Sequence, residues 1–192
     1  MYLLEDIFKM EAQEEKPSLT EINKEKQEKI EKQIIYYPQS EQIDLSSYDE
    51  DTDNIDMSLS RLTCIENFSK FKNLQSICFR SNLLKTLVTN NLLPENGLLH
   101  IDELDFYDNQ IEKIENLNQL VTLESLDLSF NRLSKIENLE MLVNLKKLFL
   151  VHNHFTKIEN LENLIKLELL ELGDNQLRQI ENLNSLTNLQ QL

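Results

Sequence analysis

The chain is 192 residues long and strongly acidic, with 34 Asp and Glu residues against 19 Lys and Arg residues and a formal net charge of −15. This charge disfavours nucleic acid and membrane surfaces as partners, because both are anionic and repel the chain at long range. Two cysteines exclude a disulfide framework and indicate a reducing compartment. With no apolar run near the roughly 18 residues of a membrane helix, the sequence predicts a soluble, intracellular protein whose partner is a basic protein surface.

Residues 1–51 contain no repeat, and we expect them to form a charged N-terminal arm that is partly disordered or helical. Two Glu–Lys pairs at i,i+4 spacing between residues 25 and 32 favour a solvated helix. Pro38 would end that helix. The acidic run 48–56 is predicted to be a flexible connection to the domain that follows.

From residue 52 to 192 the sequence repeats itself every 22 residues. LESLDLSFN begins at Leu123, LKKLFLVHN at Leu145 and LELLELGDN at Leu167, and IDELDFYDN at Ile101 fits the same step. Each is followed by an Ile-Glu-Asn-Leu element. Such a period is typical of a leucine-rich-repeat solenoid. The predicted fold class is therefore an α/β repeat with one short parallel strand per repeat and a 3₁₀ or short helical turn on the convex side.

Within each strand we expect alternate side chains to point into and out of the solenoid, by the two-residue period of a strand. Leu126 and Leu128 are predicted to face inward, and Ser125, Asp127 and Ser129 outward. The asparagine after each strand can bond unpaired backbone groups of the turn. We therefore expect an internal ladder of Asn82, Asn109, Asn131, Asn153 and Asn175.

The convex side is predicted from helix-like spacing of apolar residues after each ladder asparagine, such as Ile136, Leu139 and Leu142. Asn138, directly before Leu139, is placed to cap a short helical turn there.

The repeats nearer the N-terminus are less regular. LQSICFRSN begins at Leu74, and because 101 − 74 = 27, five extra residues are expected in a loop marked by Pro94 and Gly97. A degenerate first repeat, with Ser60 in the asparagine position, is predicted from its apolar residues: Ile55, Met57, Leu62, Ile65, Phe68 and Phe71.

At the other end, LQQL from Leu189 opens a strand that is not completed. We expect the array to stop in mid-repeat, as a truncated solenoid would.

Equivalent outward positions of stacked parallel strands form columns about 4.8 Å apart. The central column of the concave face is predicted to be Asp56, Cys78, Asp105, Asp127, Phe149 and Glu171. The carboxylates also fit a merely solvated surface. An outward phenylalanine, however, exposes apolar area that suits a binding anchor. The predicted partner-binding residues are Asp105, Asp127, Phe149 and Glu171.

The sequence contains no recognisable catalytic or metal-binding motif. His152 and His154 flank Asn153 in a nuclease-like triplet, but Asn153 is the repeat asparagine and no further His or Cys clusters nearby. Glycine occurs only at positions 97 and 173, so a phosphate-cradling loop is excluded. We therefore predict a protein without enzymatic activity, cofactor, metal or small-molecule substrate.

The 22-residue unit with its Ile-Glu-Asn-Leu element resembles the repeats of the protein phosphatase 1 regulatory subunit 7 family. LDFYDNQIEKIENL, LKKLFLVHN and LELGDNQLRQIENLNSLTNL carry this resemblance, which covers roughly residues 52–192 and includes variable positions such as Tyr107 and Val151. It implies a regulatory or scaffold subunit of nucleus and cytoplasm that docks the phosphatase catalytic subunit on its concave face. The family's contact column would fall on Asp127, Phe149 and Glu171.

Asp105 occupies the same column one repeat earlier. An alternative interpretation is that the chain has the same fold but binds a different protein, because related short repeats occur in axonemal, centrosomal and spliceosomal adaptors.

Overall fold

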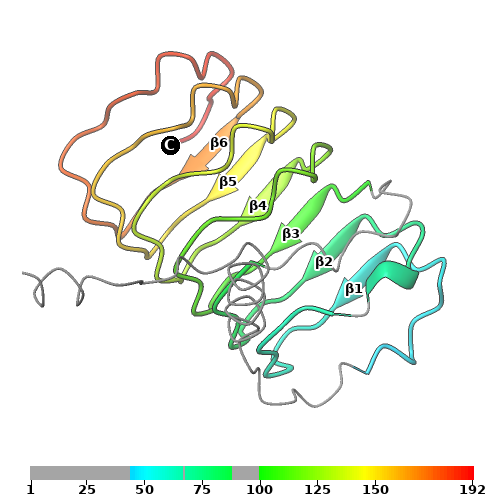
Figure 1. Cartoon of the computed structure of the whole chain (residues 1–192). Helices are drawn as coiled ribbons and strands as arrows, with labels where there is room; N and C mark the ends of the chain where they lie inside the picture. The colour runs from blue at the N-terminus through cyan, green and yellow to red at the C-terminus, as the bar shows by residue number, and fades with distance from the viewer. Residues whose placement is uncertain (1–43, 67, 88–99) are drawn as a thin grey trace, which may run out of the picture. The chain divides into compact units, whose positions relative to one another are not determined.

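The computed structural model describes residues 44–66, 68–87 and 100–192, which form one stack of repeats (Figure 1). The predicted arm up to residue 43 and the predicted loop around Pro94 and Gly97 lie outside the described residues. Six parallel strands form a single sheet in chain order, one strand per repeat. They are β1 (Asn54–Asp56), β2 (Ser76–Cys78), β3 (Glu103–Asp105), β4 (Ser125–Asp127), β5 (Lys147–Phe149) and β6 (Leu169–Glu171). The predicted solenoid is confirmed.

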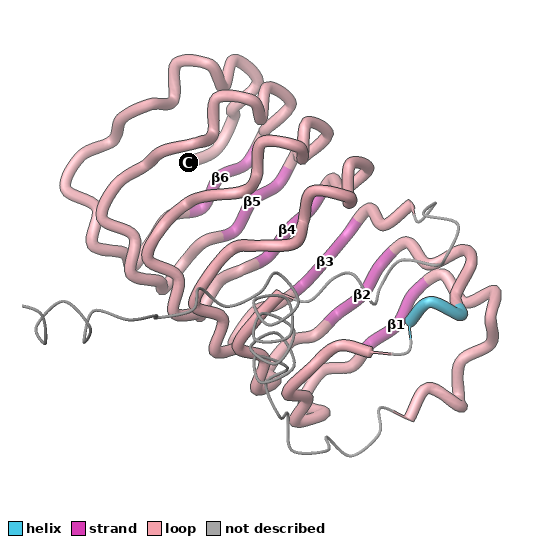
Figure 2. The backbone as a smooth tube through the Cα atoms, in the orientation of Figure 1, coloured by secondary structure: helices cyan, strands magenta, loops and turns pink. Residues whose placement is uncertain are grey.

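The strand register follows the repeat step. Leu104 pairs with Leu126, and Leu126 with Leu148, at 22-residue intervals. Ile77 pairs with Leu104 across 27 residues, so the five extra residues do not disturb the register. The degenerate first repeat also supplies a strand, because Ile55 of β1 pairs with Ile77 of β2. Figure 2 shows the strands side by side, with irregular segments connecting each strand to the next.

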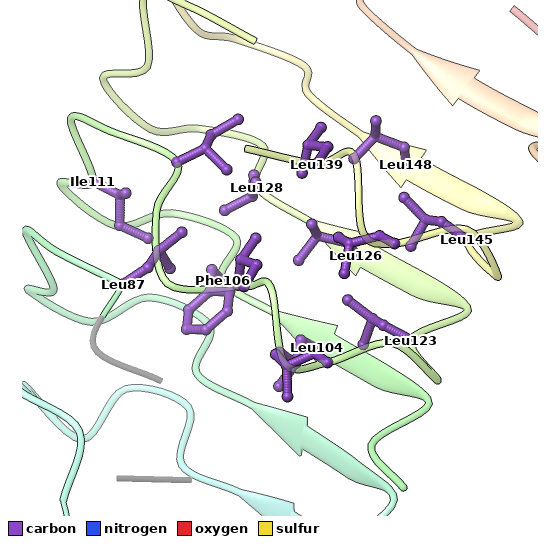
Figure 3. Packing of buried hydrophobic residues seen from close by; sticks show 14 of the residues in the cluster. Leu87, Leu104, Phe106, Ile111, Leu123, Leu126, Leu128, Leu139, Leu145 and Leu148 are labelled. Carbon is purple, nitrogen blue, oxygen red and sulfur yellow. The ribbon is translucent and has the colours of Figure 1, made fainter. Parts of the chain in front are cut away.

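The core lies between the sheet and the returning segments. The central residue of every strand is buried, and so are Leu128 and Leu150, which follow two residues later. Figure 3 shows Leu126 and Leu148 packed with leucines of the returning segments, such as Leu139. The predicted outward position of Ser129 is wrong, because β4 ends at Asp127 and the inward-outward alternation continues only to Leu128. Ser129 is 3% exposed, and its hydroxyl accepts a hydrogen bond from the Val151 N–H at 3.3 Å.

The asparagine ladder is present as predicted. Asn131 Nδ2 lies 2.9 Å from the carbonyl oxygen of Phe106 in the preceding repeat and 3.1 Å from that of Leu128 in its own repeat. Asn131 Oδ1 accepts the Ile111 N–H at 2.9 Å. The amide therefore satisfies backbone groups of two repeats at once, which a buried turn requires. The equivalent bonds are made by Asn82, Asn109, Asn153 and Asn175.

The returning segments contain the tight turns expected of a 22-residue repeat. The Leu142 N–H donates to the Leu139 carbonyl, and the Leu145 N–H donates to the Leu142 carbonyl, each at 3.0 Å. These i→i+3 bonds are those of a 3₁₀ turn. The described residues contain a single helix, the 3₁₀ helix η1 (Phe68–Lys70).

The predicted cap at Asn138 is wrong. Asn138 has a φ of 58°, and its Nδ2 donates to the carbonyl of Ile114 in the preceding repeat at 2.6 Å. Asn160 and Asn182 make the same bond to Ile136 and Ile158. These residues form a second ladder between repeats. Asparagine suits this position because it tolerates a positive φ and carries a donor that reaches the neighbouring backbone.

The acidic segment before the first repeat packs on the solenoid. Leu45 is 4% exposed and belongs to the core, and its carbonyl accepts a hydrogen bond from Lys70 Nζ at 3.0 Å. The Tyr48 hydroxyl donates to the carbonyl of Asp56 at 3.0 Å. The prediction of a flexible connection over residues 48–56 is therefore wrong. Apolar side chains of this segment cover the first repeat, and its last three residues form β1.

We expect hydrogen exchange to be fastest at the C-terminal end of the described chain. Gln191 bridges to β6, since the Leu170 N–H donates to the Gln191 carbonyl at 3.0 Å. The side chains around it are poorly covered, however. Ile180 is 73% exposed, whereas its equivalent Ile158, one repeat earlier, is 1% exposed. Local opening requires little free energy where few apolar contacts hold a segment. Amide protection measured by mass spectrometry should fall from Leu167 to Leu192, and uniform protection there in a monomer would contradict this expectation.

Candidate protein-binding surface

The four predicted partner-binding residues lie in one column across the sheet. Asp105 pairs with Asp127, Asp127 with Phe149, and Phe149 with Glu171. Each of the four side chains is half-buried, and none belongs to the core. The structure therefore places an aromatic ring between two carboxylates on the outward face of the sheet. The predicted alignment of these four residues across the sheet is confirmed.

The column runs along a hollow of about 560 Å³ on the concave face. Asp105, Asp127 and Phe149 line this hollow, together with Asp56 and Cys78 of the two preceding strands. Glu171 is not among its lining residues. The carboxylates that line the hollow come from β1, β3 and β4, and Phe149 lines it at β5. The surface offers a negatively charged recess beside an apolar patch.

Asp127 is more enclosed than its neighbour Asp105, with a side chain that is 19% exposed against 26%. Burial raises the pKa of this carboxyl above its ordinary value, and the neighbouring Asp105 acts in the same direction. The Ser129 N–H, which donates to Asp127 Oδ1 at 2.8 Å, and the Arg80 guanidinium both lower the pKa, but burial is the larger effect. The surroundings of Asp127 thus destabilise the ionised form of its carboxyl group relative to the neutral form.

Asp105 has an internal partner that the sequence interpretation did not identify. Arg80 Nε and Nη2 lie 3.1 Å and 2.8 Å from Asp105 Oδ2, and the bond from Asp105 raises the pKa of Arg80. The guanidinium carbon of Arg80 also lies 4.4 Å from the centre of the Tyr107 ring. Repeat register places Arg80 level with Tyr107 but does not reveal how far its side chain reaches along the sheet.

A row of ring side chains in contact follows the strand ends beside this column. Tyr107 contacts Phe130 at a ring-centre distance of 4.8 Å, and Phe130 stacks on His152 at 4.6 Å. His152 Nδ1 contacts the carboxylate of Asp174. Phe130 has a φ of 56°, a conformation that disfavours bulky residues. The ring of Phe130 gives His152 a structural contact. Asn153, the residue after His152, belongs to the asparagine ladder.

We expect Asp127→Asn to raise the free energy of unfolding at pH 7. An acid whose pKa is higher in the folded chain stabilises the fold below its ordinary pKa of 3.8, and this stability is lost as the pH rises through the higher, folded value. At pH 7 the ionised Asp127 therefore carries a penalty that the amide removes, while the amide oxygen still accepts the Ser129 N–H. Urea unfolding at several pH values checks this.

The gain from Asp127→Asn should shrink as the pH falls toward 3.8, where the wild-type carboxyl becomes neutral as well. Glu112→Gln, which neutralises an exposed carboxylate outside the sheet, serves as the matched control. A loss of stability at pH 7, or a gain that does not depend on pH, would contradict the assignment.

Within residues 44–66, 68–87 and 100–192, no group of three or more His, Cys, Asp and Glu side chains is arranged to hold a metal ion. In the same part of the chain, no helix has the length and apolar character needed to cross a membrane.

Comparisons with known proteins match the repeat region. A model of leucine-rich repeats in two copies matches residues 100–141, 121–166 and 143–185. Protein phosphatase 1 regulatory subunit SDS22 of Schizosaccharomyces pombe is 42% identical over 94 residues, which are 45% of this chain and 26% of that protein. The subunit of the same name from Saccharomyces cerevisiae is 37% identical over 110 residues, 52% of this chain and 32% of that protein. The chain thus spans between a quarter and a third of these curated relatives.

Solved structures of leucine-rich-repeat proteins share the fold. An internalin of Listeria monocytogenes superposes with a TM-score of 0.58 at 26% identity, over 68% of this chain and 38% of that one. A leucine-rich-repeat protein of Leptospira interrogans gives the same TM-score at 29% identity, over 65% and 32% of the two chains. The parallel strands, the asparagine ladder and these relatives agree. The chain is a leucine-rich-repeat solenoid, and its repeats are similar to those of the protein phosphatase 1 regulatory subunits named above.

Proposed function

We propose that this chain is a regulatory or scaffold subunit that binds the catalytic subunit of protein phosphatase 1 through its concave face. The observation that carries the proposal is the column Asp127–Phe149–Glu171, in which a half-exposed aromatic ring stands between two carboxylates. Two relatives named as phosphatase regulatory subunits, at 42% and 37% identity, supply the partner. Their names describe regulation, so the proposed role involves binding and not catalysis.

The chemistry of the column favours a partner surface with an apolar pocket bordered by Lys or Arg. Phe149 can enter such a pocket, because apolar area at the centre of an interface contributes most to affinity. Asp127 and Glu171 would then face cations at the border of the pocket, where charges guide association and fix the orientation. The three residues span about 10 Å, two strand spacings of the sheet. The net charge of −15 supports the same choice of a basic partner.

The proposal is tested by immobilising the chain and titrating it with purified phosphatase catalytic subunit in a biosensor. We expect saturable binding whose association slows as salt is added, because exposed charges are screened. A second catalytic subunit, from an unrelated phosphatase class, controls for general adhesion to an acidic surface. Binding that is absent, or equal for both enzymes, would contradict the proposal and favour an adaptor for an axonemal, centrosomal or spliceosomal protein.

The same proposal implies that the chain is found in both nucleus and cytoplasm, as expected of a subunit that accompanies the phosphatase. Fluorescence imaging of the tagged chain tests this part independently of binding.

A further inference from the structure

The charged side chains that line the concave hollow are acidic, with the exception of one arginine. Among the described residues that line it, Asp56, Glu103, Asp105 and Asp127 are acidic, and Arg80 is the one Lys or Arg. Arg80 reaches from the loop after β2 to the carboxylates of β3 and β4, since its Nη2 lies 2.8 Å from Asp105 Oδ2 and 3.9 Å from Asp127 Oδ2. A cation of this chain thus occupies the position in which a cation of a basic partner would be bound.

The guanidinium is held on two sides. Two of its nitrogens, Nε and Nη2, bond one oxygen of Asp105, and its central carbon lies 4.4 Å from the centre of the Tyr107 ring. The Tyr107 ring is supported in turn by Phe130, at a ring-centre distance of 4.8 Å. An arginine that is both paired and stacked loses less conformational freedom on binding than a mobile one. Arg80 is therefore already oriented for the carboxylates that it contacts.

We propose that Arg80 is a specificity-determining residue of the concave face that competes with the partner's cations for Asp105 and Asp127. It neutralises Asp105 and reduces, without removing, the charge that Asp127 presents, so that a basic partner binds at Phe149, Glu171 and the remaining charge of Asp127. This inference rests on the proposed function, because it takes a surface rich in Lys or Arg as the occupant of the face. It differs from the sequence expectation, in which Asp105 was one of the contact residues.

Arg80→Gln should strengthen binding to the phosphatase catalytic subunit about twofold to fivefold, because an exposed ion pair is worth up to about 1 kcal/mol and 1.4 kcal/mol is tenfold in affinity. The gain should appear mainly in the association rate and decrease at high salt. Arg132→Gln is the matched control, since Arg132 is exposed and outside the lining of the hollow. Both variants remove one positive charge, so a difference between their affinities for the partner must come from the place of the arginine on the surface.

Asp105→Asn gives the second readout. With Arg80 present it should weaken binding by up to about fivefold, because it leaves the Arg80 cation free to repel a basic partner and to pair with Asp127. In the Arg80→Gln background the same change should remove the gain, which a merely structural role for Arg80 does not predict. Circular dichroism confirms that each variant is folded before binding is compared.

A synthetic arginine-rich peptide, used in place of the phosphatase, separates this inference from the proposed function. If the phosphatase does not bind but Arg80→Gln strengthens peptide binding relative to Arg132→Gln, the proposed partner is wrong and the competition stands. If Arg80→Gln and Arg132→Gln behave alike with both ligands, or if Arg80→Gln weakens binding, the competition is overturned.

Discussion

Truncating Leu148 to Ala will lower the free energy of unfolding by about 2–5 kcal/mol. Leu148 is the central residue of β5, is 0% exposed, and pairs with the equally buried Leu126 and Leu170 of the neighbouring strands. Removing three carbons there leaves a cavity in the middle of the stack. Each repeat contacts only its neighbours, so the void cannot be filled by rearrangement of a distant part of the core.

Equilibrium unfolding in urea, followed by far-ultraviolet circular dichroism, measures this loss. Lys147→Ala is the matched control, because Lys147 precedes Leu148 in the same strand and is exposed. The control should change stability by less than about 0.5 kcal/mol. A Leu148→Ala loss no larger than that of the control would mean that the strand register is wrong by one residue, since such a slip exchanges the inward and outward faces.

The repeat period made most of the fold predictable from the sequence. A 22-residue step fixes which positions are equivalent, and the alternation of a strand then separates Leu126 from Asp127. The ladder asparagines were predictable for the same reason, because one amide per turn must bond backbone groups that have no other partner. Even the 27-residue step into Ile101 kept the register, since the sheet constrains the strands and leaves the connecting loops free to vary in length.

The features that the sequence did not predict depend on contacts between repeats. Ser129 continues the outward pattern in the sequence, but the chain turns after Asp127 and buries the hydroxyl. Asn138 looks like a cap, yet its side chain bonds the backbone of the preceding repeat. Arg80 lies 25 residues from Asp105, and only the geometry of two adjacent turns brings their side chains together. The column of binding candidates was predictable, whereas its partial neutralisation was not.

Phe149→Ala should weaken binding to the phosphatase catalytic subunit about tenfold or more. Burying a phenylalanine side chain is worth roughly 1.5–3 kcal/mol, and each 1.4 kcal/mol is a factor of ten in affinity. Asp127→Ala and Glu171→Ala should have smaller effects at physiological salt, because charges at the border of an interface influence association rate more than final affinity. Calorimetric titration of each variant with the catalytic subunit checks this order.

Met141→Ala controls for loss of exposed apolar area in general. Met141 is 48% exposed and lies outside the six strands, on a segment that returns over the convex side. It should leave affinity within about twofold of wild type, as most surface truncations outside an interface do. Equal losses for Phe149→Ala and Met141→Ala would indicate adhesion through apolar patches and not a defined contact at β5.

The most direct test of the concave-face account is the affinity of the catalytic subunit for a chain in which Asp127, Phe149 and Glu171 are all changed to Ala. All three side chains point away from the core, so the variant should unfold within about 1 kcal/mol of wild type, and its affinity should fall at least as far as that of Phe149→Ala. If the folded triple variant binds the phosphatase as tightly as the wild-type chain, the partner contacts another surface and the concave-face account is wrong.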